Sequence, residues 1–250
     1  MTDQMLSVPT PDGEMGAFVR RPDGDGPFPV IVYFHHGPGL DEGTKESMGF
    51  LADAGYYVVS HDRYHREEPW LVADIAKLRA AGPEAEAAQK KFFGILLGTT
   101  DDMVESDLMA LLAVVGKDPA ARKAPMGVIG FCIGARSVMR TLAMHPDIFT
   151  AGVGLHPSFC TTEDADSPHV AVETYDGLLY IAFGSEDKMQ SPDANKPFID
   201  AVNDMPDGRG LAEIHPGADH GFSVPGGAYQ KAAADRSYEK ALEIFAKAVA

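Results

Sequence analysis

A cysteine stands between two glycines at residues 130–134, in the order Gly-Phe-Cys-Ile-Gly. The apolar run Met126–Ile129 before it predicts a strand, and Ala135–Met144 after it predicts a helix. A Gly-x-nucleophile-x-Gly turn between a strand and a helix is a nucleophile elbow, where small neighbours let the strand and the helix approach. The helix N-terminus behind Cys132 favours the thiolate, which is the reactive form of cysteine. We therefore predict that Cys132 is a nucleophile rather than a buried structural thiol.

An acid and a base follow this cysteine in the order that an elbow of this kind requires. The strand predicted at Leu178–Phe183 leads into a loop with two carboxylates, of which Asp187 is the predicted acid and Glu186 the alternative. His220 lies past the last predicted strand, between Asp219 and Gly221, and is the predicted general base. His215 is the alternative base, but it lies close to the end of that strand.

Two backbone amides should stabilise the oxyanion that forms when the nucleophile attacks. One is that of Ile133, directly after the nucleophile. The other is predicted at Gly37, in the glycine-containing loop that follows the strand Val30–Phe34. The pair His35 and His36 could suggest a metal, but no third ligand stands at a clear spacing, so we predict neither a metal nor a cofactor.

The elements that would position these groups alternate between strand and helix. Such alternation predicts an α/β fold with a mainly parallel central sheet and helices on both faces, preceded by an antiparallel hairpin. The helices between Trp70 and Val115 would either form a lid or cover the sheet. The predicted strands are Gln4–Val8, Met15–Arg20, Val30–Phe34, Tyr56–Ser60, Met126–Ile129, Ala151–Leu155, Leu178–Phe183 and Leu211–Ile214. The predicted helices are Lys45–Ala54, Trp70–Ala81, Glu84–Leu97, Asp102–Val115 with Asp101 as its cap, Ala135–Met144, Ala194–Val202 and Ala232–Ala248.

The composition is that of an acidic globular protein. The 250 residues fit one α/β domain over residues 1–250, because such domains reach roughly 250 residues without dividing. The formal net charge of −16 disfavours binding to nucleic acid and to anionic membranes. Two cysteines make no disulfide framework, no run is apolar enough to span a membrane, and the first residues lack the pattern of a signal peptide. We therefore expect a reduced, cytoplasmic protein.

The Gly-Phe-Cys-Ile-Gly elbow, the Gly-Ser-Glu-Asp loop and the His-Gly-Phe segment occur in the same order as in the dienelactone hydrolase family, which this chain resembles from about Met15 to Ala248. The cysteine is the specific part of the match, since most α/β-hydrolases use serine. The resemblance implies an α/β-hydrolase fold and cofactor-free hydrolysis of a cyclic enol-lactone or related ester. Cys132, His220 and Asp187 match the family's Cys-His-Asp triad.

The resemblance also assigns two substrate-binding positions, with two departures. Members of the family place a glutamate near the resting nucleophile, where this chain has His36. Arg66 matches the first of two arginines that bind a substrate carboxylate, whereas Val224 stands where the second is expected. We therefore predict a hydrolase of a small-molecule ester or lactone. The alternatives are a catalytically silent binding protein with the same fold, or a redox-sensing thiol at Cys132.

Overall fold

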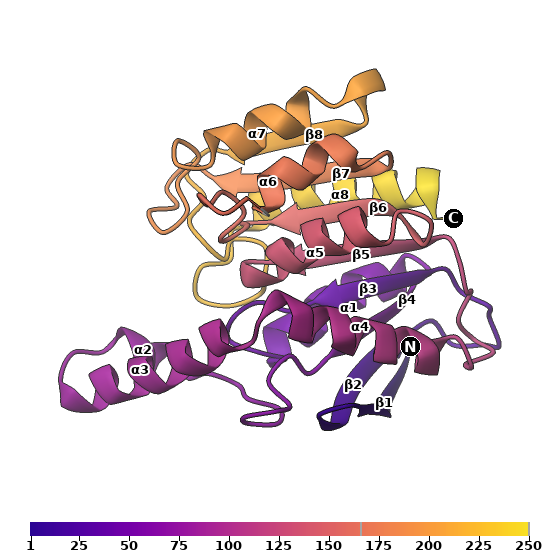
Figure 1. Cartoon of the computed structure of the whole chain (residues 1–250), viewed down its shortest axis with the longest axis horizontal. Helices are drawn as coiled ribbons and strands as arrows, with labels where there is room; N and C mark the ends of the chain where they lie inside the picture. Colours follow the sequence, from indigo (N-terminus) through magenta and orange to yellow (C-terminus); the bar gives the residue numbers. More distant parts are fainter. Residues whose placement is uncertain (166, 250) are drawn as a thin grey trace.

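The computed structural model describes residues 1–165 and 167–249, and an eight-stranded sheet runs through it in the order β1-β2-β4-β3-β5-β6-β7-β8 (Figure 1). The strands β3 to β8 are parallel, while β1 and β2 pair antiparallel with each other, and β2 pairs antiparallel with β4. The predicted α/β architecture with an N-terminal hairpin is confirmed. The strands are β1 Thr2–Thr10, β2 Gly13–Arg21, β3 Val30–Phe34, β4 Tyr57–His61, β5 Met126–Phe131, β6 Phe149–Leu155, β7 Leu178–Gly184 and β8 Gly210–His215.

Helices cover both faces of this sheet, as Figure 1 shows. On one face, α4, α5 and α7 contribute apolar side chains to the same core as β3, β5 and β7, and on the other face α1 and α8 do so. The helices are α1 Glu42–Asp53, α2 Ile75–Arg79, α3 Pro83–Gly98, α4 Asp101–Val115, α5 Ile133–Met144, α6 Pro168–Ala171, α7 Lys196–Asn203 and α8 Lys231–Ala248. Every residue of β3, β4 and β5 is buried, which is expected for parallel strands covered on both faces. None of the helices in the described part of the chain combines the length and apolarity that a bilayer-spanning helix requires.

The helix predicted over Trp70–Ala81 is wrong for its first half, because α2 covers only Ile75–Arg79. Trp70 has a φ of 59°, a left-handed conformation that no α-helix contains. Its backbone amide donates a 2.6 Å hydrogen bond to Oδ2 of Asp62, and this bond fixes the turn. The helix starts only where Asp74 caps it, with Oδ1 accepting a 3.0 Å bond from the amide of Lys77.

The cap predicted for α4 is also wrong. Thr100 caps this helix, since its hydroxyl accepts a 3.3 Å bond from the amide of Met103. Asp101 is already inside the first turn, and its carboxylate instead pairs with Arg136 at 2.7 Å. The predicted and observed caps are neighbours, and either residue type can cap a helix, so the local sequence does not separate them.

Buried imidazoles make the stability of this fold depend on pH. Burial lowers the pKa of His35 to about 4 and that of His61 to about 3, against 6.5 for an exposed histidine. Between these values the unfolded chain binds protons that the folded chain does not, so acid destabilises the fold. We expect the free energy of unfolding to fall by about 2 kcal/mol per imidazole between about pH 6.5 and pH 5. Urea unfolding at the two pH values measures this loss.

A matched variant isolates one of the two imidazoles. Nδ1 of His61 is buried without a hydrogen-bond partner among the described residues, and its ring packs edge-on against Phe34. His61→Phe removes the titrating group while keeping an aromatic ring, so the loss of stability in acid should shrink by about 2 kcal/mol, the share of one imidazole. An unchanged pH dependence in this variant would contradict a contribution from His61.

Candidate active site

The elbow cysteine lies between the end of β5 and the first residue of α5. Cys132 has a φ of 55° and a ψ of −120°, a conformation that a residue with a side chain adopts only when its surroundings impose it. Backbone bonds do so on both sides: its amide donates to the carbonyl of Leu155 at 3.1 Å, and its carbonyl accepts from the amide of Ser158 at 3.0 Å. The thiol is thereby held at the carboxyl edge of the sheet, where loops can bring other groups to it.

The two glycines of the elbow are required by close contact of the strand with the helix. A Cβ on Gly130 would lie 2.3 Å from the carbonyl oxygen of Gly134, and a Cβ on Gly134 would lie 2.3 Å from that of Phe34. Both contacts are with backbone, so no side chain can turn away to relieve them. The sequence pattern thus has a direct steric reason.

Adding one methyl group at the elbow should be costly. We expect Gly134→Ala to lower the free energy of unfolding by about 2–4 kcal/mol, because α5 would have to move away from β3. Gly94→Ala is the control: a Cβ there has open space within 4 Å in helix α3, so stability should rise by up to about 1 kcal/mol. Chemical denaturation compares the two variants with the parent protein. Equal stabilities of the two variants would contradict the steric explanation.

The histidine and the acid predicted from sequence meet at this edge. Nδ1 of His220 lies 2.7 Å from Oδ2 of Asp187, which is 1% exposed. The other carboxylate oxygen accepts bonds from the amides of Met189 at 2.9 Å and Gln190 at 2.8 Å. Burial alone would raise the pKa of Asp187, but the bond to His220 and these two amides lower it. The carboxylate therefore stays ionised and holds Nδ1 of the imidazole, while Nε2 is buried and has no hydrogen-bond partner among the described residues.

The alternative acid and base lie elsewhere. Glu186 is exposed, and the hydroxyl of Ser185 lies 3.4 Å from its carboxylate. His215 is buried against α8, with Nε2 at 2.9 Å from the hydroxyl of Ser237. The structure therefore brings Asp187 and His220 together and leaves both alternatives outside the pair.

The sulfur and the imidazole shift each other's pKa in opposite directions. Burial raises the pKa of the Cys132 thiol, but the neighbouring His220 imidazole, Ser158 and the Gly37 amide bring that pKa down to about 6. Burial lowers the pKa of His220, but its bond to Asp187 and the nearby Cys132 sulfur raise it to about 10. These opposite shifts favour a thiolate beside an imidazolium near neutral pH, and the two groups titrate as a coupled unit.

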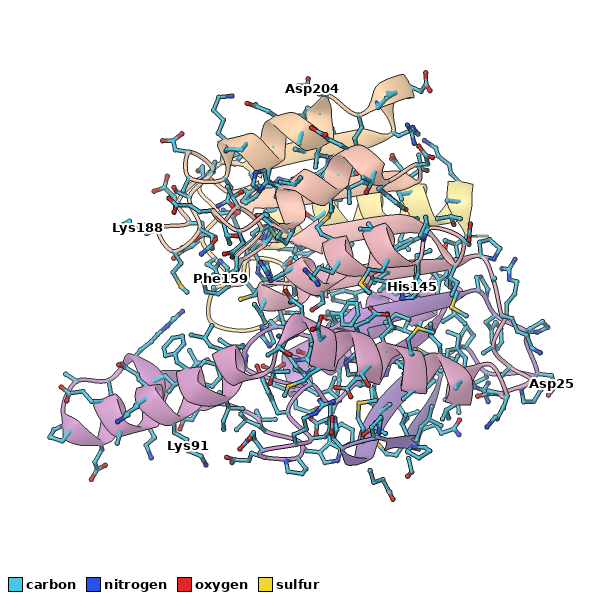
Figure 2. The ribbon with its side chains drawn as sticks, viewed as in Figure 1. Asp25, Lys91, His145, Phe159, Lys188 and Asp204 are labelled. Atoms are coloured by element: carbon cyan, nitrogen blue, oxygen red, sulfur yellow. The ribbon has the colours of Figure 1, made fainter. Side chains whose placement is uncertain are left out.

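Two residues that the sequence did not single out contact this pair, and both come from the loop after β6. The hydroxyl of Ser158 lies 3.4 Å from Sγ of Cys132. The ring of His156 packs edge-on against that of His220, with 5.0 Å between their centroids. Phe159, labelled in Figure 2, follows them at the same edge of the sheet as Lys188, which follows Asp187. The rule that places functional groups at the carboxyl ends of parallel strands could have pointed to this loop.

The predicted oxyanion donors belong to two segments next to Cys132. The amide of Gly37 is close enough to lower the pKa of Cys132, and Ile133 follows the nucleophile as the first residue of α5. The loop that carries Gly37 is closed by a 3.0 Å bond from the amide of Gly39 to the carbonyl of His36. The hydroxyl of Tyr64 donates a 2.7 Å bond to the carbonyl of Gly37 and fixes this turn.

Helix α3 forms an apolar wall beside these donors. In Figure 1, α2 and α3 project beyond the edge of the sheet, whereas α4 lies over the sheet itself. Side chains of α3 nevertheless reach back to the site, because a Cβ on Gly37 would lie 3.5 Å from Phe92 and 3.8 Å from Leu96. Leu96 is buried with Tyr64 and Ile133, and Cys132 packs against this group. The sequence left open whether the helices between Trp70 and Val115 form a lid or cover the sheet. In the structure, α4 covers the sheet and α3 borders the site.

The two predicted substrate-binding side chains have other partners in this structure. Nε2 of His36 lies 3.3 Å from Oδ2 of Asp41, the residue that caps α1. The guanidinium of Arg66 makes two bonds, of 2.7 and 2.8 Å, with the buried carboxylate of Asp107, and a third of 2.8 Å with Asp12. A substrate carboxylate would have to compete with two acids for Arg66.

Comparison with known proteins bears on this arrangement of groups. The sequence model of the dienelactone hydrolase family matches residues 15–249. The chain belongs to the dienelactone hydrolase family. The match begins in the second strand of the hairpin and ends at the residue after the last helix, so it includes the elbow at Cys132.

Individual dienelactone hydrolase relatives are distant in sequence, and the matched share of each differs. A Synechocystis sp. protein provisionally named a carboxymethylenebutenolidase is 24% identical over 247 residues, which is 96% of this chain and 95% of the relative. The carboxymethylenebutenolidase of Pseudomonas putida is 26% identical over 135 residues, 54% of this chain and 53% of that enzyme. A crystal structure from Klebsiella pneumoniae, provisionally named a dienelactone hydrolase, superposes with a TM-score of 0.80 at 20% identity and covers 98% of both chains. The fold is thus the α/β-hydrolase fold of this family, and the chain is an ester or lactone hydrolase.

Proposed function

We propose that this hydrolase cleaves small esters or lactones through a covalent thioester on Cys132, with His220 and Asp187 completing a Cys-His-Asp triad. The observation that supports this most strongly is the sulfur at the strained elbow, whose pKa is lowered to about 6 beside an imidazole that Asp187 holds at 2.7 Å. A nucleophile, a base within reach of it and an acid that orients the base are the parts that acyl transfer needs.

The first half of the reaction uses the resting ion pair. The Cys132 thiolate attacks the acyl carbon, and the carbonyl oxygen takes up negative charge between the amides of Gly37 and Ile133. When this intermediate collapses, the bond from carbon to the leaving oxygen breaks. The proton on Nε2 of His220 passes to that oxygen, so an alcohol or enol departs and a thioester with neutral His220 remains.

Water completes the cycle with the same groups. Neutral His220 takes a proton from a water molecule, and the resulting hydroxide equivalent attacks the thioester carbon. The second tetrahedral intermediate expels the thiolate, the acid product leaves, and the imidazolium beside Cys132 is restored. Asp187 keeps Nε2 directed at the sulfur in both halves.

The nucleophile itself limits the range of substrates. A thiolate is a good leaving group, so an intermediate formed from an amide returns to starting material more often than it advances, whereas an ester of a weakly basic alcohol or enol goes forward. We therefore propose activated esters and lactones as substrates, with no cofactor.

The anchoring role of Arg66 and the contact of His36 with substrate stay predictions. A reduced thiol is needed for the chemistry, and this need fits a cytoplasmic setting.

Pre-steady-state hydrolysis of a p-nitrophenyl ester tests this proposal. We expect a burst of p-nitrophenol equal to one equivalent of protein, followed by slower steady turnover, because acylation should precede a slower deacylation. A catalytically silent binding protein would bind the ester and release no p-nitrophenol above the spontaneous rate, and that result would overturn the proposal.

A further inference from the structure

We propose that Ser158 is a further catalytic residue, whose hydroxyl donates a hydrogen bond to Sγ of Cys132 and helps to keep the sulfur as a thiolate. This inference rests on the proposed function only in taking Cys132 as the nucleophile. It adds to the triad a fourth side chain in direct contact with the reacting sulfur.

The contact itself fixes the direction of the bond. Oγ of Ser158 lies 3.4 Å from Sγ of Cys132, which is within reach for a hydrogen bond to sulfur. A thiolate carries no proton, so in the ionised pair the serine hydroxyl must be the donor. Ser158 is only 2% exposed, so little water competes for its hydroxyl. A bond from a buried hydroxyl to a charged acceptor is among the stronger hydrogen bonds in proteins.

The backbone holds this hydroxyl in place. The amide of Ser158 donates a 3.0 Å bond to the carbonyl of Cys132, so the serine and the nucleophile are joined at main chain as well as at side chain. The neighbouring residues His156 and Phe159 have φ values of 38° and 57°, which are strained for residues with side chains. A 2.7 Å bond from Arg136 to the carbonyl of Phe159 fixes the far side of the loop. Strained turns on both sides of Ser158 direct its side chain at the sulfur.

Ser158 can donate a hydrogen bond to the sulfur at stages of the cycle when His220 and the amide of Gly37 cannot. His220 must give its proton to the leaving group, and the amide of Gly37 must turn from the sulfur to the oxyanion when the carbonyl is attacked. The serine hydroxyl takes part in neither transfer, so it can stabilise the thiolate at rest. It can also stabilise the thiolate again when the carbon–sulfur bond breaks in the second half of the reaction.

Titration of the thiolate by its ultraviolet absorbance tests this role without any turnover. The signal reports one residue, because burial raises the pKa of Cys160 far above the normal range, and Cys132→Ala gives the baseline. In the parent protein we expect a midpoint at about pH 6. In Ser158→Ala we expect the midpoint to rise by about one pH unit, so that the thiolate fraction at the parent midpoint falls about fivefold.

Two matched variants make the outcome decisive. Ser60→Ala removes a buried hydroxyl that has no partner among the described residues, and should leave the midpoint unchanged. Ser158→Thr keeps a hydroxyl at the site, so its midpoint should stay closer to that of the parent protein than the midpoint of Ser158→Ala. Near-ultraviolet circular dichroism shows whether each variant is folded. A folded Ser158→Ala protein that titrates at the parent midpoint would overturn the inference. The result is independent of the proposed function, since loss of the burst with a normal titration shift would overturn only the function.

Discussion

Replacing Cys132 by alanine is expected to lower kcat for an activated aryl ester by about 10⁴-fold or more, with the far-ultraviolet circular dichroism spectrum unchanged. The loss is large because the variant keeps the oxyanion amides and the imidazole but has no group that can form the thioester. Alanine is smaller than cysteine, and Cys132 is not fully buried, so the fold should persist. Steady-state kinetics with a p-nitrophenyl ester measures the effect.

The second cysteine supplies the control for this experiment. Cys160 is 0% exposed and belongs to the core on the α5 face of the sheet. Cys160→Ser changes the chemistry of a thiol with almost no change in volume, and kcat should stay within about threefold of the parent value. If instead Cys132→Ala kept full activity, the nucleophile would have to be another residue.

Asp187→Asn should have the second largest effect, a fall in kcat of about 10³–10⁴-fold. An asparagine amide can donate to Nδ1, which would place the proton of the neutral imidazole on Nε2 and leave that nitrogen unable to accept a proton from the thiol or from water. The midpoint of the thiolate titration should rise as well, since Asp187 supports the imidazolium beside Cys132. Kinetics and titration on the same preparation measure both effects.

The neighbouring carboxylate offers a closely matched control for the acid. Glu186→Gln makes the same chemical change one residue away, on an exposed side chain, and should leave kcat within about twofold. A stronger loss in Glu186→Gln than in Asp187→Asn would transfer the orienting role to Glu186 and contradict the geometry around His220.

Much of the architecture could be predicted from the sequence because its signals are local. Val30–Phe34 is an unbroken apolar run, and such a run predicts a strand buried on both faces, which β3 is. The elbow at Cys132 combines a strand, two glycines and a helix within a few residues, so its geometry follows from sterics alone. The order of nucleophile, acid and base then places Asp187 and His220 at the same edge of the sheet.

Other parts of the site depend on contacts between segments far apart in the chain. Ser158 reaches the sulfur because β6 lies beside β5, and no local pattern around residue 158 marks it. Trp70 breaks the predicted helix because Asp62 captures its amide. The position of Arg66 along the chain suits contact with a substrate, yet Asp107 on α4 and Asp12 in the hairpin turn bind its guanidinium. The sequence around Arg66 does not show that these distant acids compete for it.

Mass spectrometry of the acylated protein tests the thioester on Cys132 most directly. A reaction of a p-nitrophenyl ester with the parent protein, quenched in acid during the burst, is expected to add the mass of one acyl group, because acylation should precede a slower deacylation. Digestion in acid should locate that mass on the peptide that contains Cys132, and free hydroxylamine should remove it, as it does from thioesters. An acyl group found on any other residue, or turnover by the parent protein with no acyl group ever trapped on Cys132, would contradict the proposed mechanism.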